Sequence, residues 1–313
     1  MTEIIKLSSK DVNRILEDYD IGTYLDHKYI TWAFSNSVYF LDTTKGRFIL
    51  KVHQDIGSDK LNFVQNTMEY ARNKGLPVAE IIKNNKGRLN YLYKGKVISI
   101  QRFVKGKEIG MSNQNSIKLA GEIAGRVDKE LYKIPLKRKF YNYKFILAKI
   151  TKSPVNIKNF DFTNAERQIL KDSRKIKIRK LRKSVIHCDL GGHMISSKGK
   201  ITAIIDWDDA KETYLVSETA KFIADHFLID KRTLKNKVRV FLNEYQKYVK
   251  LNNEEKVALY YLIKRSYLES IEWYVREQKT HNNKDILKWI NELLDKYRSF
   301  DRIPLKEFIK EID

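Results

Sequence analysis

Apolar residues along the first hundred positions recur with two different spacings. Residues 37–51 contain two β-rich runs that flank a turn-forming cluster at 42–46, which predicts a hairpin. Over residues 58–73 the apolar positions recur at helical spacing instead. Residues 88–103 again read as two short strands around a Lys-Gly-Lys turn. This part of the chain therefore predicts a small antiparallel sheet with one helix on it.

Helical spacing dominates the remainder of the chain. It is clear over residues 112–131 and again over 217–310, while a further hairpin is expected within 186–206. The pattern predicts the α+β class, with a β-rich lobe at residues 1–105 and a larger, mostly helical lobe at 106–313. A ligand is expected between such lobes, because binding clefts commonly form between domains.

Composition narrows the class of protein. The 313 residues are 42% hydrophobic, which is enough apolar material for a core and argues against a wholly disordered chain. The single cysteine, Cys188, excludes an internal disulfide framework and a multi-cysteine metal site. Apolar runs are only a few residues long, so no membrane span and no membrane partner are expected. We expect a soluble, cytoplasmic protein.

The charge of the chain is strongly basic. Lys and Arg total 61 against 39 Asp and Glu, which gives a net charge of +22. Such a charge suits nucleic acid or another polyanion, and residues 167–183 are rich in Lys and Arg. No zinc-finger, helix-turn-helix or aromatic RNA-binding pattern accompanies this run, which favours a solvated helix over a nucleic-acid partner. The charge also weighs against a polycationic substrate.

The most informative stretch runs from residue 185 to residue 208. Asp189 lies on a Gly-rich loop after a short apolar run, and Asp206 lies at the end of the hairpin that follows. Two carboxylates brought together with His193 would suit a divalent cation beside a general base. The alternative interpretation is that Asp189 caps a turn and Asp206 ends a strand, as Asp often does.

These residues resemble a known family, the aminoglycoside phosphotransferase and choline kinase group, which has a protein-kinase-like fold. His187-Cys188-Asp189 is similar to the start of its H-x-D-x-x-x-x-N motif, and Ile205-Asp206-Trp207 is similar to its I-D-[WF] motif. The resemblance implies that Asp189 is the catalytic base and that Asp206 binds the metal. The C-terminal helices resemble the homoserine-kinase-like branch most.

The resemblance also implies nucleotide-binding residues in the first lobe. Lys51 occupies the place of the lysine that holds the phosphates, and Ser35 and Asn36 lie in the short phosphate-covering turn. Gln101 and Phe103 lie where the family binds adenine through backbone groups. The cofactors implied are ATP or GTP with Mg²⁺.

Several supporting positions depart from the family pattern. The family's metal-binding Asn corresponds to Met194, or to His193 if the loop is one residue short. The Glu that pairs with the lysine corresponds to Gln65, which would hydrogen-bond Lys51 without a charge, while Glu69 lies one helical turn further on.

Two functions follow from these observations. The first is a nucleoside-triphosphate-dependent phosphotransferase that modifies a hydroxyl of a small molecule, with an antibiotic and an amino alcohol among the acceptors left open. The second is a catalytically weak or inactive relative that serves as a binding or coat-type structural protein. The sequence does not indicate an oligomeric state.

Overall fold

The computed structural model describes residues 5–31, 33, 36–54, 56–136, 150, 155–280 and 285–313. The chain separates into two compact units. The first contains the part up to Lys107 together with Thr202–Asp208, and the second contains Glu108–Ile201 and Asp209–Asp313. The segment Thr202–Asp208 therefore belongs to the first unit although it comes late in the sequence. The predicted division between residues 105 and 106 does not place it there.

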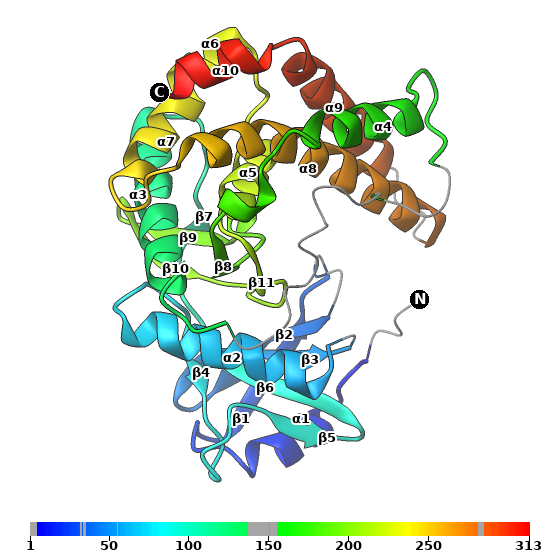
Figure 1. The fold of residues 1–313 in the computed structure, drawn as a ribbon. Helices are drawn as coiled ribbons and strands as arrows, with labels where there is room; N and C mark the ends of the chain where they lie inside the picture. The colour runs from blue at the N-terminus through cyan, green and yellow to red at the C-terminus, as the bar shows by residue number, and fades with distance from the viewer. Residues whose placement is uncertain are drawn as a thin grey trace. The chain divides into compact units, whose positions relative to one another are not determined.

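The first unit is built on an antiparallel sheet with the strand order β1-β2-β3-β6-β4, and β5 pairs with β6 (Figure 1). Its strands and helices are α1 (Ser9–Leu16), β1 (Tyr24–Tyr29), β2 (Ser37–Thr43), β3 (Gly46–His53), α2 (Ser58–Asn73), β4 (Ile81–Ile82), β5 (Tyr91–Tyr93) and β6 (Lys96–Arg102).

The two predicted hairpins and the predicted helix of this unit are confirmed. Strands β2 and β3 pair from Ser37 opposite Val52 to Thr43 opposite Gly46. Between β5 and β6, Lys94 and Gly95 both have positive φ angles, 49° and 74°, as a two-residue hairpin turn requires. Helix α2 has the bounds that the apolar spacing predicts.

Helix α1 and strand β1 were not predicted. Helix α1 has only eight residues, but a capping box fixes its start, because the Ser8 hydroxyl accepts from the Asp11 amide and the Asp11 carboxylate accepts from the Ser8 amide. Strand β1 is a sheet edge whose sequence, YLDHKY, is largely polar and lacks a buried face. Neither element is long or apolar enough to produce a clear periodic signal.

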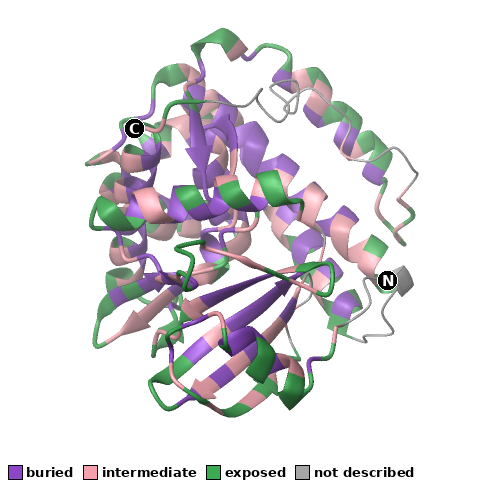
Figure 2. Cartoon of the chain, turned by 90° about the horizontal axis from the view of Figure 1, so that it is seen from below, coloured by how far each residue is buried: buried purple, intermediate pink, exposed green. Residues whose placement is uncertain are grey.

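The two faces of β3 have different surroundings. Phe48, Leu50 and Val52 belong to the buried cluster that α1 completes with its own apolar residues. Because side chains alternate along a strand, Lys51 and His53 point to the opposite face, and both are nevertheless buried. Buried positions, drawn purple in Figure 2, follow the strands of this sheet. A buried ammonium group on a sheet face needs carboxylates close by.

The second unit is mostly helical. Its elements are β7 (Lys107–Glu108, at the boundary), α3 (Gln114–Leu131), α4 (Phe162–Ser173), β8 (Lys183–Ile186), β9 (Met194–Ser197), β10 (Lys200–Ile204, which crosses the boundary), β11 (Lys211–Tyr214), α5 (Val216–His226), α6 (Lys231–Thr233), α7 (Arg239–Gln246), α8 (Asn253–Thr280), α9 (Asp285–Asp301) and α10 (Leu305–Ile312). Short 3₁₀ turns lie at Ile178–Lys180 and Gly191–His193, and a π-helical turn lies at Leu234–Val238.

Two short β arrangements support the loop after β8. Strand β8 pairs antiparallel with β11, from Ile186 opposite Lys211 to Lys183 opposite Tyr214. Strands β9 and β10 form the predicted hairpin, with Lys198 and Gly199 at positive φ in its turn. Long helix α8 packs against both α5 and α9 (Figure 1). The loop that carries Asp189 thus starts from a paired strand.

Helices α3 and α7 approach each other closely because α3 contributes glycines to their interface. A Cβ atom at Gly125 would lie 2.6 Å from the carbonyl oxygen of Tyr245, and one at Gly121 would meet the carbonyl oxygen of Phe241. Two glycines one helical turn apart therefore set how near the two backbones lie.

We expect Gly121→Ala to destabilise the protein by about 1–3 kcal/mol, because the new methyl group must push the two helices apart. The sign of the change in stability is informative, because Gly→Ala within an unconstrained helix stabilises the protein by about 1 kcal/mol. Urea unfolding measures the change, with Gly110→Ala as the control because nothing lies near a Cβ atom there. A Gly121→Ala protein as stable as the wild type would contradict the close approach.

Candidate active site

Lys51 of β3 lies in an ion-pair group within the first unit. Its Nζ is 2.8 Å from Oδ1 of Asp206 and 2.7 Å from Oδ2 of Asp208. Burial alone would lower the pKa of Lys51, but the two carboxylates hold that pKa well above its usual range. The ammonium group therefore stays charged inside the protein.

Asp206 is held in position through hydrogen bonds to the backbone of Ile204, two residues before it. The Ile204 amide donates to the Pro77 carbonyl at 2.5 Å, and the Ala79 amide donates to the Ile204 carbonyl at 3.4 Å. The indole of Trp207 is buried and also donates to the Ile204 carbonyl, at 3.2 Å. Asp206 itself has a φ of 55°, in the left-handed region that non-glycine residues rarely adopt. Such local strain is common at functional sites and points to a constrained carboxylate.

Asp189 lies in the second unit on a loop that Glu218 of α5 holds at two points. The Glu218 carboxylate accepts hydrogen bonds from the amide of Cys188 at 2.6 Å and from the amide of Leu190 at 3.2 Å. Cys188 has a φ of 73°, so the chain turns sharply just before Asp189. Asp189 is thus fixed through the peptide groups of both of its neighbours.

A lysine and a histidine lie next to the Asp189 carboxylate. Lys221 Nζ is 3.2 Å from Oδ1 of Asp189 and 2.9 Å from Oδ2 of Asp225, and His193 Nε2 is 3.7 Å from Oδ2 of Asp189. Burial opposes ionisation of Asp189, but Lys221 and His193 lower its pKa below the usual value. Asp189 is therefore an ionised carboxylate at neutral pH.

The loop after Asp189 requires glycine at position 191 for steric reasons. A Cβ atom at Gly191 would lie 2.8 Å from Nε2 of His226 and 3.5 Å from Oδ2 of Asp225. Only glycine lets the loop pack this closely on α5. The loop, its clamp Glu218 and the lysine Lys221 therefore belong to one tightly packed assembly.

Met194 and His193 have different surroundings, which bears on the choice between them as a metal ligand. The Met194 side chain is fully buried, and its carbonyl accepts the Ile109 amide at 2.9 Å. His193 is partly exposed and adjoins Asp189. Met194 is therefore a core residue of β9, whereas His193 lies beside the predicted base.

The predicted contact between Gln65 and Lys51 is wrong. Gln65 is buried on α2, where its amide nitrogen donates to the Leu89 carbonyl at 3.1 Å and its amide oxygen accepts from Asn90 at 2.9 Å. Glu69, one helical turn further along α2, pairs with Lys83 at 3.0 Å. Spacing along a helix did not reveal that this face of α2 meets the 89–90 loop.

The remaining nucleotide-binding predictions are placed as follows. Ser35 lies outside the described residues. Asn36 donates to Asp208 at 2.8 Å and so joins the Lys51 group. Gln101 lies on β6, paired opposite Ile49 of β3 and Ile81 of β4. The Phe103 amide donates to the Arg47 carbonyl at 3.3 Å, so this backbone donor is already engaged.

Two residues at these sites were not predicted in their structural roles. Asp208 directly follows the Ile205-Asp206-Trp207 motif and pairs with Lys51. Lys221 was not singled out at all, although Lys221 and Asp225 are four residues apart on α5 and such pairs share a helix face. Nothing in the sequence connects that face with Asp189.

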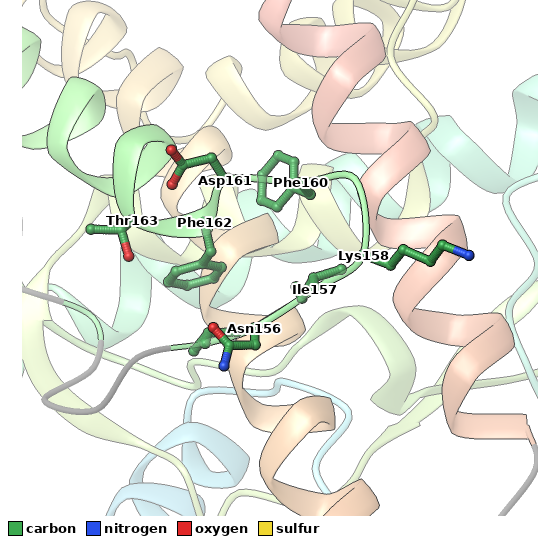
Figure 3. A pocket seen from close by; sticks show the side chains of 8 residues that line it. Asn156, Ile157, Lys158, Phe160, Asp161, Phe162 and Thr163 are labelled. Atoms are coloured by element: carbon green, nitrogen blue, oxygen red, sulfur yellow. The ribbon is translucent and has the colours of Figure 1, made fainter.

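A shallow hollow of about 490 Å³ lies along the loop that leads into α4 (Figure 3). It is lined by Val155, Asn156, Ile157, Lys158, Phe160, Asp161, Phe162 and Thr163. In Figure 3 the side chain of Lys158 points away from that of Asp161, and Asp161 caps α4 by accepting from the Asn164 amide at 2.9 Å. None of the predicted site residues lines this hollow.

Glu218 should make stability depend on pH. Burial, with the nearby charge of Asp189, raises the pKa of Glu218 to about 7, although the two loop amides oppose this shift. The raised pKa means that the stability given by protonated Glu218 is present below about pH 4.5 and is lost as the pH rises through 7. Relative to wild type, Glu218→Gln should therefore gain on the order of 3 kcal/mol in the free energy of unfolding between pH 5 and pH 8. Urea unfolding of both proteins at the two pH values tests this, and a constant difference would contradict it.

Comparison with known proteins identifies the family. The model of a phosphotransferase enzyme family, APH, matches residues 26–248. A homoserine kinase from Methylobacillus flagellatus is 24% identical over 263 residues, which is 82% of each chain. A homoserine kinase from Neisseria meningitidis is 23% identical over 265 residues, or 82% of this chain and 85% of the relative.

Solved structures show the same fold at low identity. An amicoumacin kinase in complex with AMP-PNP, Ca²⁺ and Ami has a TM-score of 0.75 at 14% identity, covering 96% of this chain and 95% of that chain. A microcompartment-associated aminopropanol kinase has a TM-score of 0.75 at 13% identity, covering 97% and 100%.

These likenesses confirm the predicted α+β, protein-kinase-like fold. None of the helices in the described part of the chain has the length and apolar character that a membrane span requires. The match over residues 26–248 covers more than half of the sequence and agrees with the motifs around Asp189 and Asp206. The chain belongs to the phosphotransferase enzyme family.

Proposed function

We propose that this enzyme transfers the γ-phosphoryl group of ATP or GTP to a hydroxyl of a small molecule. The observation that carries the proposal is Asp189, an ionised carboxylate fixed on its loop by the two hydrogen bonds to Glu218. A fixed carboxylate of this kind is what a general base for a hydroxyl requires. Family membership supplies the reaction class, and the Lys51 group supplies charges suited to phosphates.

In the proposed reaction, Asp189 accepts the proton of the acceptor hydroxyl. The acceptor oxygen forms a bond to the γ-phosphorus, and the bond from that phosphorus to the bridging oxygen of the β-phosphate breaks. The products are a phosphate monoester and a nucleoside diphosphate. Lys51 neutralises charge on the nucleotide phosphates, since positioning and charge stabilisation are the main demands of phosphoryl transfer.

The donor set of the first unit suits Mg²⁺. Mg²⁺ in phosphoryl-transfer sites is bound by one or two carboxylates together with substrate phosphates and water. Asp206 offers such a carboxylate, whose side chain is 48% exposed even with Lys51 beside it. Bound at Asp206, the metal would supply positive charge to the phosphates. We propose His193 as a further ligand, because the alternative, Met194, is buried and carries a soft thioether.

The acceptor we propose is a small amino alcohol. Homoserine kinases match over four fifths of the chain, and an aminopropanol kinase shares the fold from end to end. An antibiotic acceptor is the competing outcome, since an amicoumacin kinase has the same fold. Nucleotide consumption measured over homoserine, aminopropanol and a set of aminoglycosides distinguishes the two classes.

Two isosteric variants separate the proposed roles. Asp189→Asn should lower kcat by about 10²–10⁴-fold while Mg²⁺-nucleotide affinity is kept, because only the proton acceptor is lost. Asp206→Asn should instead weaken Mg²⁺-dependent nucleotide binding by about tenfold or more, because the negative charge of the oxygen ligand is lost. Steady-state kinetics and calorimetric titration measure both effects. A wild-type protein that binds no nucleotide at millimolar concentration with Mg²⁺ would overturn the proposed function.

His193 and Met194 can be compared directly. His193→Ala should raise the Mg²⁺ concentration needed for half-maximal activity by about tenfold. Met194→Leu should leave that concentration unchanged, since it replaces one buried apolar side chain with another of similar volume. If Met194→Leu shifted the Mg²⁺ requirement and His193→Ala did not, Met194 would be the ligand and the role proposed for His193 would be wrong.

A further inference from the structure

The lysine of the first unit needs an acidic partner that α2 does not supply. Gln65 is uncharged, and both ends of its amide are engaged with Leu89 and Asn90. Glu69 forms its ion pair with Lys83. Neither α2 residue holds the Lys51 ammonium, so its position depends on groups from elsewhere in the same unit.

Asp206 and Asp208 both contact Lys51, but the two carboxylates differ in their surroundings. The Asp206 side chain is 48% exposed, whereas that of Asp208 is 24% exposed. The Oδ2 atom of Asp208 that contacts Lys51 at 2.7 Å also accepts from Asn36 at 2.8 Å. His53 Nδ1 lies 3.7 Å from the same oxygen, beyond hydrogen-bond length. Asp208 is thus enclosed by donors.

The groups around Asp208 are themselves fixed to the sheet. The side-chain oxygen of Asn36 accepts a hydrogen bond from the backbone amide of Gln54 at 3.2 Å. His53 Nε2 lies 2.8 Å from the Ser99 hydroxyl of β6. His53 and Ser99 are both buried. Asp208 therefore has a prepared position on the same sheet face as Lys51, whereas Asp206 keeps an open side.

These contacts indicate different roles for the carboxylates of Asp206 and Asp208. A metal ion on Asp206 would compete with Lys51 for that carboxylate, since both are cations that seek the same oxygens. Asp208 would then be the acid that keeps the ammonium in place while Asp206 binds the metal. We propose that Asp208 is the positioning residue of Lys51 and replaces the acidic partner that α2 lacks. This inference rests on the proposed function, because it assigns Lys51 to the nucleotide phosphates.

A double-mutant cycle on Mg²⁺-nucleotide affinity tests the inference, and it needs no knowledge of the acceptor. Asp208→Asn should weaken the affinity at least about fivefold in the wild-type background. In a Lys51→Met background the same change should cost less than about twofold, because Asp208 acts through Lys51. Asp208→Glu should restore part of the loss. A merely structural role would give equal losses in both backgrounds.

The matched control is Asp42→Asn, which removes another carboxylate of the first unit that pairs with a cation, Arg47, away from Lys51. It should leave nucleotide affinity unchanged. Gln65→Glu should not improve affinity, because the new carboxylate would face the Leu89 carbonyl oxygen rather than Lys51.

The possible results separate the two proposals. If the wild type binds Mg²⁺-nucleotide but the cycle is additive, or if Gln65→Glu improves binding, the role of Asp208 is overturned and the proposed function stands. If the wild type binds no Mg²⁺-nucleotide, the proposed function fails and the inference fails with it. Urea unfolding of each variant checks that the loss is not a loss of folded protein.

Discussion

The buried charge of Lys51 is the constraint on which the arrangement of the first unit depends. A buried ammonium group on the face of a sheet is costly unless carboxylates surround it. The chain satisfies this need by returning to the first unit at Thr202–Asp208, and the backbone bonds of Ile204 to Pro77 and Ala79 fix that return. The residues that bear the charges are far apart in the sequence, so the ion-pair group also ties distant parts of the chain together.

The second unit solves a different problem, that of holding one carboxylate still. Asp189 follows a residue in the left-handed region, a conformation that costs free energy and must be compensated nearby. Glu218 provides the compensation through hydrogen bonds to the amides on both sides of Asp189. Glycine at position 191 then allows the loop to lie directly on α5. The sharp turn at Cys188, the buried carboxylate of Glu218 and the absence of a side chain at Gly191 together define the position of Asp189.

Sequence patterns over a few neighbouring residues were sufficient to predict the hairpins and helix α2. Alternation and turn residues located the hairpins, and apolar spacing gave both ends of α2. The same rules failed for α1 and for the polar edge strand β1, which are defined by packing and pairing rather than by periodicity.

The candidate site could be predicted only where a motif carried it. The predictions of Asp189, Asp206 and Lys51 rest on recognisable short patterns in their neighbouring residues. The partner of Lys51 was misjudged because helix spacing says which residues share a face and not what that face meets. Gln65 meets the 89–90 loop, and the acid that Lys51 does meet comes from more than 150 residues further along the chain. Contacts of this kind follow from tertiary structure alone.

The net charge of +22 has less bearing on the acceptor than its size suggests. Lys51 lies between two aspartates and Lys221 lies between two others, so each of these groups has two acidic side chains for one basic side chain. Surface charges farther away than a Debye length of about 8 Å are largely screened in physiological salt. The basic surface therefore has little effect on this site, where the charge next to Asp189 is set by Lys221 and Asp225. An acceptor with a single amine is compatible with that local balance, and the overall charge gives no reason to exclude it.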